Sequence, residues 1–175
     1  MADIDVGAAA ENRISYWGND TVVAKENPAN ATGVIDYIAI YSTWAMKGVE
    51  VASLVHEGSN VLSTNGVSGA LGDQAGSGLN EYSAPTDFSA FDINENEYIG
   101  YYCTTPGIDR VGEGEGVWYA YLEDRIPAKS ITFTWSGSNT ISLYAEGTVA
   151  APPVVAKKED WGLLPVFGYL WPLFE

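Results

Sequence analysis

Residues 33–42 read GVIDYIAIYS, and this stretch decides the fold class. β-Branched and aromatic side chains fill it, which is typical of a β-strand and not of a helix. A second strand is indicated at 47–57, where the side chains alternate between two faces. Val49, Val51, Ser53 and Val55 share one face in this pattern, and Glu50, Ala52, Leu54 and His56 share the other.

Shorter strands are indicated on both sides of this pair. They cover residues 2–7, 20–24, 61–63, 97–102, 117–122, 130–135 and 140–149, and Phe88 with Phe91 marks one more. Turn sequences separate them at 18–20, 57–60, 65–66, 106–107 and 136–139. About eight to ten short strands at this spacing predict an all-β fold, an antiparallel β-sandwich of jelly-roll type. Residues 69–87, rich in Gly, Ser and Ala, are expected to form the longest loop.

The composition agrees with strands and turns, and it constrains the partners. The 175 residues suit one domain, and 13% of them are aromatic, with 19 Gly and 8 Pro. Lys and Arg total 8 against 23 Asp and Glu, so the formal net charge is −15. A field of this sign repels phosphate, which argues against nucleic acid and an anionic membrane surface as partners.

A single cysteine, Cys103, and a single histidine, His56, restrict the chemistry. An intrachain disulfide and a metal site rich in His or Cys are excluded, and a Ser-His-Asp site would have to use His56. We expect His56 to be a surface or turn residue, because no nucleophile motif accompanies it. Nothing basic adjoins Cys103 to lower its thiol pKa, so we expect a buried, unreactive thiol.

Two acidic segments raise the question of a metal. Oxygen-bearing side chains recur at Asp92, Asn94 and Asn96, as at the start of a calcium loop. The glycine and the closing glutamate of the helix-flanked loop are missing, so a sandwich-type calcium site and a plain polar turn remain as interpretations. Residues 113–116 read EGEG and form a second acidic loop, hinged by glycine. We expect turns at both segments, with no metal and no other cofactor.

Several aromatic residues of the body are candidates for a sugar-binding face, because flat rings pack on the apolar faces of sugars. They are Trp17, Trp44, Trp118, Tyr119, Tyr121 and Trp135. Packing in the core and between strands is the other interpretation, and it takes up most aromatic side chains of a sandwich. We favour the core, and both interpretations stay open.

The C-terminal residues differ from the rest of the chain. Residues 150–153 read AAPP, a stiff extended linker, so we divide the chain into a β-sandwich body, 1–149, and an arm, 150–175. Residues 161–174 carry no charge, and their prolines forbid a continuous helix. An apolar patch of this size is seldom left in water. We predict that it binds a partner chain through Trp161, Leu163, Leu164, Phe167, Tyr169, Leu170, Trp171, Leu173 and Phe174.

Two alternatives for the arm are packing on its own body and insertion into a membrane interface. The apolar run is too short to span a bilayer. The N-terminus reads MADID, without the basic and apolar regions of a secretory signal. We therefore expect no signal peptide, and synthesis and assembly in a cytoplasm.

Several stretches, taken in order, resemble a known class of module. They are residues 3–9, 91–93, 97–102, 116–119 and 141–147, which read DIDVGAA, FDI, EYIGYY, GVWY and ISLYAEG. In this order they resemble jelly-roll β-sandwich modules of tailed-phage structural proteins and prophage-encoded surface proteins. The resemblance covers 1–149, and it implies a non-enzymatic virion component that decorates a capsid or forms part of a tail or fibre.

The first functional hypothesis is therefore a structural assembly protein of a virion, assembled in the host cytoplasm. Its arm would join it to copies of itself and to other subunits. A carbohydrate-binding β-sandwich module, with a glycan as its partner, is the alternative suggested by the aromatic residues. An enzyme is the third hypothesis, and it would need a pair of acids or His56 in a cleft.

Overall fold

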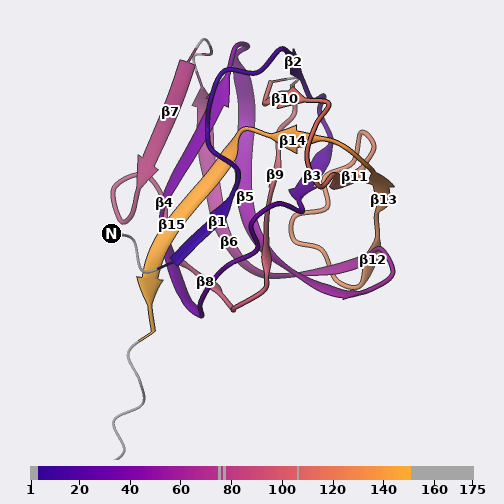
Figure 1. The fold of residues 1–175 in the computed structure, drawn as a ribbon. Coiled ribbons are helices and arrows are strands. Elements are labelled where there is room, and N and C mark those ends of the chain that lie inside the picture. The colour runs from indigo at the N-terminus through magenta and orange to yellow at the C-terminus, as the bar shows by residue number, and fades with distance from the viewer. Residues whose placement is uncertain (1–3, 75, 77, 106, 151–175) are drawn as a thin grey trace, which may run out of the picture.

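A computed structural model describes residues 4–150 except 75, 77 and 106. This part of the chain is built from β-strands and connecting segments (Figure 1). The strands are β1 (Ile4–Gly7), β2 (Ser15–Tyr16), β3 (Thr21–Ala24), β4 (Gly33–Ser42), β5 (Met46–Gly58), β6 (Val61–Gln74), β7 (Gly78–Ser83), β8 (Phe91–Ile93), β9 (Tyr98–Tyr102), β10 (Asp109–Val111), β11 (Val117–Ala120), β12 (Ile131–Thr132), β13 (Thr134–Ser136), β14 (Thr140–Ile141) and β15 (Leu143–Val149).

The strands form two large sheets and one small sheet near one end of the body (Figure 1). One large sheet has the order β1-β15-β4-β7, with β8 also paired to β4, and the other has the order β12-β6-β5-β9-β3-β11-β13. The small sheet has the order β14-β10-β2. The pairings between described strands are antiparallel. The predicted all-β, antiparallel sandwich is confirmed, and its jelly-roll type stays a prediction.

The main core lies between the two large sheets, and β4 supplies its centre. Ile35, Ile38 and Ile40 are fully buried in it, together with apolar side chains of β1, β3, β5, β9 and β15. Strict alternation would send 35 and 38 to opposite faces. Where β4 pairs with β15, the register shifts opposite Glu146 and Gly147 and leaves one extra residue in β4. This bulge turns all three isoleucines toward the core.

A second core covers the other face of the seven-stranded sheet. Ala52 and Leu54 of β5 are fully buried there. The segment between β11 and β13 covers them, since it contributes the buried residues Ile126, Ala128 and Phe133. The alternation predicted at 47–57 therefore exists, and its second face is divided: Ala52 and Leu54 are in the second core, whereas His56 is exposed.

The expected loop at 69–87 is wrong. β6 continues to Gln74, and β7 follows at Gly78–Ser83. Gly69 and Gly72 of β6 have φ angles of +72° and +82°, next to register shifts in the pairing of β6 with β5. Glycine permits these left-handed positions, so the small residues mark an irregular strand and not a loop.

The expected turn at 65–66 is also wrong, because both residues lie inside β6. Gly66 is required there by space: a Cβ on it would lie 2.5 Å from the backbone oxygen of Asp92. The glycine thus permits the close approach of β8 to β6. The short strand expected at 61–63 is only the beginning of β6.

Other strands are closer to expectation. The strand predicted at 33–42 has the bounds of β4. The strand expected at 130–135 is interrupted at Phe133, whose side chain enters the second core, so that β12 and β13 are separate. β2 and β10 were not predicted, since they are two and three residues long and carry mixed polar sequences.

The last described strand of the body is β15. This strand ends at Val149, and the backbone N–H of Ala150 donates to the carbonyl oxygen of Thr32 at 3.1 Å. The predicted arm begins here and lies outside the described residues, so the division into body and arm stays a prediction. No helix long and apolar enough to cross a membrane occurs in residues 4–150, as far as these are described.

We predict that Tyr101→Phe leaves the protein at least as stable as the wild type. Tyr101 is fully buried in the main core, and its hydroxyl has no hydrogen-bond partner among the described residues. Burial also raises the pKa of Tyr101 well above its ordinary value. An unpaired buried hydroxyl destabilises the folded state by about 1–3 kcal/mol, and phenylalanine avoids this penalty. Urea unfolding measures the difference.

Tyr144→Phe is the matched control, because the hydroxyl of Tyr144 donates to Glu146 Oε1 at 2.9 Å. Its replacement is expected to bring no gain. A Tyr101→Phe protein that unfolds at clearly lower urea concentration than the wild type would show that a buried water pairs the Tyr101 hydroxyl.

Candidate functional site

One end of the body carries more than half of the exposed large apolar side chains that the structure describes. We call this set the aromatic end, and it consists of Ile14, Tyr16, Trp44, Tyr121 and Leu122. The connection between β4 and β5 meets the N-terminal segment here, close to the small sheet. Surface grooves join the members, since Tyr16 lines one groove with Ile14 and Trp44 and another with Tyr121 and Leu122.

Tyr16 and Trp44 form the centre of the aromatic end. Their ring centroids lie 6.0 Å apart and their planes differ by 61°, which is an edge-to-face arrangement. Trp44 is 57% exposed and Tyr16 is 46% exposed. The two rings therefore support each other while each keeps surface open to solvent.

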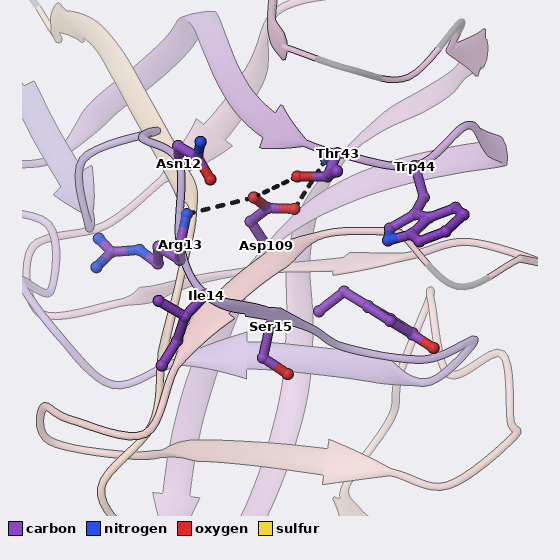
Figure 2. Close-up of a pocket in the computed structure, with 8 residues that line it drawn as sticks. Asn12, Arg13, Ile14, Ser15, Thr43, Trp44 and Asp109 are labelled. Atoms are coloured by element: carbon purple, nitrogen blue, oxygen red, sulfur yellow. Dashed lines mark hydrogen bonds between the residues drawn. The ribbon is translucent and has the colours of Figure 1, made fainter.

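A buried carboxylate holds the two rings in place. Asp109 of β10 is 1% exposed. Its carboxylate accepts hydrogen bonds from the backbone N–H of Thr43 at 2.8 Å, the hydroxyl of Thr43 at 2.9 Å and the backbone N–H of Arg13 at 3.3 Å (Figure 2). Asp109 is also the register partner of Tyr16. One side chain thus ties the residue before Trp44 to the segment that carries Tyr16.

Backbone and hydroxyl contacts add to this support. The hydroxyl of Ser42, which is fully buried, donates to the carbonyl oxygen of Gly107 and accepts from the backbone N–H of Trp44 at 3.3 Å. The backbone N–H of Trp17 donates to Ile108 at 2.8 Å, and that of Gly107 donates to Trp17 at 3.1 Å. Residues 107–109 therefore bond to both segments that carry the rings.

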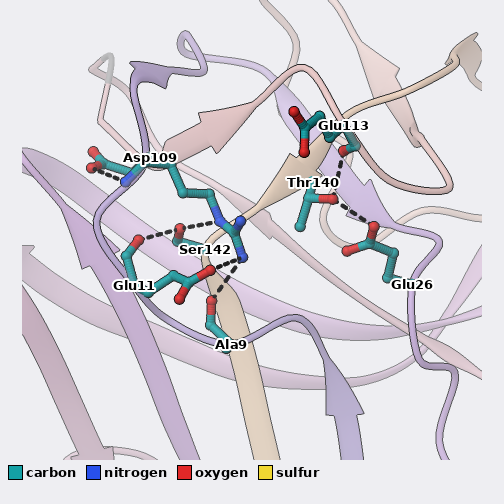
Figure 3. Close-up of polar contacts among 8 residues, drawn as sticks. Ala9, Glu11, Glu26, Asp109, Glu113, Thr140 and Ser142 are labelled. Atoms are coloured by element: carbon teal, nitrogen blue, oxygen red, sulfur yellow. Dashed lines mark hydrogen bonds and ion pairs between the residues drawn. The ribbon is translucent and has the colours of Figure 1, made fainter.

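Arg13 lines the groove between the N-terminal segment and Trp44, and its guanidinium is already paired. Its Nε donates to the hydroxyl of Ser142 at 2.9 Å, and its Nη2 donates to the carbonyl oxygen of Ala9 at 3.2 Å. The same Nη2 forms an ion pair with Glu11 at 3.1 Å, and the Ser142 hydroxyl donates to the Glu11 carbonyl oxygen (Figure 3). The positive charge is thus neutralised within the N-terminal segment.

Arg110 is bound in the same way on the other side of Tyr16. Its Nε donates to the carbonyl oxygen of Tyr16 at 3.1 Å and its Nη1 to Asn139 Oδ1 at 2.6 Å. The guanidinium also lies 5.0 Å from the ring centroid of Trp17, a cation–π contact. Arg110 therefore positions the backbone of β2 and braces the partly buried indole behind it.

Three shallow grooves surround Tyr16. The largest, about 460 Å³, lies between the N-terminal segment, Thr43 and Trp44 (Figure 2). A second of about 310 Å³ is lined by Tyr16, Trp44, Ala45 and Thr105. A third of about 300 Å³ extends from Tyr16 toward Tyr121. Each is in the size range of a small ligand subsite.

Polar groups with unused hydrogen-bonding capacity line these grooves. The side chains of Asn12, Ser15 and Tyr16 and the indole N–H of Trp44 make no hydrogen bond with the described residues. They offer donors and acceptors next to the exposed rings. The arrangement can bind a ligand that has both an apolar face and hydroxyl or amide groups.

The six aromatic residues that the sequence singled out divide into two groups. Trp118 is buried, and Trp17 and Tyr119 pack on the main core with ring centroids 5.5 Å apart. Core packing is confirmed for these three. It is wrong for Trp44, Tyr121 and Trp135, which are more than half exposed. The first two belong to the aromatic end, whereas Trp135 lies on β13.

His56 lies at the end of β5, exposed as expected. Its ring stacks on Trp118 at 4.8 Å with planes 29° apart, and its Nε2 is 2.8 Å from the carbonyl oxygen of Ser59. No carboxylate or nucleophile bonds to it among the described residues. These contacts place His56 in an aromatic stack with Trp118. The ammonium of Lys25 lies 4.7 Å from the Trp118 ring centroid, a cation–π contact on the same sheet.

The acidic segment 92–97 comprises the end of β8 and a turn at 94–97 that is organised by one buried acid. Glu97 is 4% exposed, and its carboxylate accepts from the backbone and side-chain nitrogens of Asn94 and from Asn65 Nδ2 at 3.0 Å. No group of three or more His, Cys, Asp or Glu that could hold a metal occurs in the part of the chain that the structure describes.

The second acidic segment, 113–116, is held by Glu26. The Glu26 carboxylate accepts from the backbone N–H of Glu115 at 3.1 Å and lies against the hydroxyl of Thr140 (Figure 3). Thr140 also lies 2.7 Å from the carbonyl oxygen of Glu113. These contacts close the loop on the body, so a turn describes this segment too.

The nine predicted partner-binding residues, Trp161 to Phe174, lie outside the described residues, so their role stays a prediction. Tyr16, Arg13 and Asp109, by contrast, were not singled out by the sequence. The pairing of Asp109 with Thr43 spans 66 positions, and no local pattern signals it. Comparisons with protein-family models, with curated proteins and with solved structures find no match to this chain.

We predict that Asp109→Asn destabilises the protein by about 1–3 kcal/mol. An amide keeps one acceptor oxygen but turns an NH₂ group toward donors that the carboxylate now accepts from. Asp73→Asn is the control, because Asp73 is exposed and accepts a single bond from Gly48 at 3.2 Å. Urea unfolding of the two variants compares them, and equal stability would contradict a positioning role for Asp109.

We predict that the Cys103 thiol resists alkylation in the folded protein below about pH 11. Burial raises the pKa of Cys103 from 9.0 to about 11; the Thr105 backbone opposes this rise in part, and the carboxylate of Asp20 adds a smaller rise. The folded state thus holds the thiol proton more tightly than the unfolded state. Its contribution to stability is complete below pH 9 and is lost as the pH rises through 11.

Mass spectrometry after iodoacetamide treatment at pH 8.5 measures the reaction, with the urea-unfolded chain as the control. The unfolded chain is expected to react within minutes and the folded chain to stay unmodified. Equal rates for the two would contradict the buried, protonated thiol.

Proposed function

We propose that this protein is a non-enzymatic structural subunit of a virion, a capsid-decoration or tail and fibre component. The apolar run of its arm, residues 161–174, packs on neighbouring subunits, which are copies of itself or other members of the assembly. Its β-sandwich body projects from the attachment point. The resemblance of 1–149 to phage β-sandwich modules and the composition of the arm support this assignment.

The observation that carries the proposal is the placement of two features at opposite ends of the body. Ala150, the last described residue, is bonded to Thr32, just before β4, and the aromatic end begins beside Thr43, after the end of β4. A ten-residue strand separates them, or about 30 Å at roughly 3.3 Å per residue. Figure 1 shows β15 running from the small sheet to the opposite end of the body. A subunit attached through the arm presents the aromatic end outward.

The strand that leads into the arm suits an attachment point. β15 lies inside its sheet, paired with β1 on one side and with β4 on the other. A force applied through the arm therefore acts along hydrogen-bonded strands on both sides, which must shear together. An edge strand in this position could be peeled away one bond at a time.

The side chains of the arm are sufficient to hold an assembly. Burying one large apolar side chain contributes roughly 1.5–3 kcal/mol, and Trp and Tyr are over-represented among the residues that dominate interfaces. Trp161 and Trp171 bracket the apolar run. The free energy gained by burying several such side chains exceeds the cost of ordering them, which is about 0.5–1.5 kcal/mol per immobilised side chain.

We predict that Trp161→Ala combined with Trp171→Ala abolishes self-association and leaves the body folded. Analytical ultracentrifugation of the double variant beside the wild type measures association, and circular dichroism measures folding. A chain that ends at Ala151 is expected to be soluble, to melt cooperatively and to stay monomeric.

A matched control removes two exposed tryptophans from the body, Trp44→Ala with Trp135→Ala, and is expected to assemble as the wild type does. Assembly of the Trp161 and Trp171 double variant at wild-type level would exclude the arm as the anchor. Unfolding of the body in that variant would place the arm in the core of its own chain.

A further inference from the structure

We propose that the aromatic end is a binding site for neutral carbohydrate, with Trp44 and Tyr16 as the stacking platform. This inference goes beyond the assembly role, because it concerns the opposite end of the body and uses none of the arm residues. It assigns a ligand class to a set of exposed side chains that have no role in assembly through the arm.

The ring pair has the shape that a sugar requires. A pyranose has an apolar face of C–H groups that packs flat on an aromatic ring, and a rim of hydroxyl groups that needs hydrogen bonds. Trp44 presents a half-exposed indole, and Tyr16 stands beside it with its plane turned by 61°. One ring can take the face of a sugar while the second borders its edge.

The polar groups around the rings match the hydroxyl rim. Asn12 and Ser15 line the groove of about 460 Å³ with Trp44 and have no hydrogen bond to the described residues. The Tyr16 hydroxyl and the Trp44 indole N–H add a further donor each. A purely apolar partner would leave these groups without water or partners, which costs free energy. A hydroxylated ligand satisfies them.

The platform is rigid before any ligand arrives. Asp109 fixes Thr43 and Arg13 through three hydrogen bonds, and Ser42 fixes the backbone of Trp44. A preorganised site loses little conformational entropy on binding, which matters most for ligands that bury a small area. The buried polar groups beneath the rings thus serve the site above them.

The charges favour neutral sugars over acidic ones. The guanidinium groups of Arg13 and Arg110 are the cations that flank the grooves, and both are occupied by acceptors of the protein itself. The chain as a whole carries a formal charge of −15. A sialylated or sulfated glycan would meet this field without a free cation to offset it.

The test is a glycan array probed with the full chain, carrying neutral hexose and N-acetylhexosamine oligosaccharides beside sialylated and sulfated ones. Titration of tryptophan fluorescence then gives dissociation constants for the neutral oligosaccharides bound. Trp44→Ala is expected to weaken binding about tenfold or more, as for a central interface aromatic. Asn12→Ala, at an exposed residue without a hydrogen bond to the described residues, is expected to weaken it several-fold and to leave the melting curve unchanged.

Trp135→Ala is the matched control, because Trp135 is 55% exposed, close to the 57% of Trp44, and lies on β13 away from the grooves. It is expected to bind as the wild type does. No binding to any neutral glycan, binding confined to acidic glycans, or equal losses in the Trp44 and Trp135 variants would each overturn the proposal.

A second copy of the chain is the other occupant that an exposed aromatic surface could take. If Trp44→Ala alone reduces self-association in sedimentation, the aromatic end is an interface between copies and the carbohydrate proposal fails. The arm variants keep the two proposals apart. Loss of assembly in the Trp161 and Trp171 variant with intact glycan binding supports both, and each can fail without the other.

Discussion

Strand β4 is hydrogen bonded along one edge to β15 and along the other to β7 and β8, and most of the molecule depends on this arrangement. Its isoleucines fill the centre of the main core. Its first residue follows Thr32, which is bonded to the last described residue, Ala150, and its last, Ser42, is the buried anchor for Trp44. A single strand therefore fixes the distance between the proposed attachment point and the proposed binding site.

The two cores explain why the two large sheets differ in the number of faces that are buried. The five-stranded sheet is buried on one face, whereas the seven-stranded sheet is covered on both, by the main core and by the segment that contains Phe133. A sheet covered on both faces needs apolar residues at consecutive positions, and β5 supplies them from Val51 to Leu54 apart from the hydrogen-bonded Ser53. Of the three aromatic residues whose packing was correctly expected from the sequence, Trp118 belongs to the second core, and Trp17 and Tyr119 pack on the main core.

The sequence predicts what depends on local pattern and fails where packing decides. The strand at 33–42 was predictable to the residue, because β-branched side chains mark it throughout. The neighbours of Gly66 in the sequence indicate a turn, but a glycine is needed at this position because the backbone of Asp92 lies against it. Trp44 reads as core from its chemistry, but it follows Thr43 at a strand end, where no second sheet covers it. The aromatic end unites residues near 16, 44 and 109, and only the tertiary fold brings them together.

Asp109 shows how a site of this kind is built. A carboxylate that is almost completely buried needs several donors to offset its lost hydration, and the backbone groups of two distant segments supply them. Those two segments are then held at a fixed separation, whatever backbone conformation each would adopt alone. The two rings they carry can stay exposed without collapsing onto the surface, because their backbones are already committed. The buried polar contact and the exposed rings thus depend on each other: the contact fixes the backbone, and the rings of the proposed binding surface stay open to solvent.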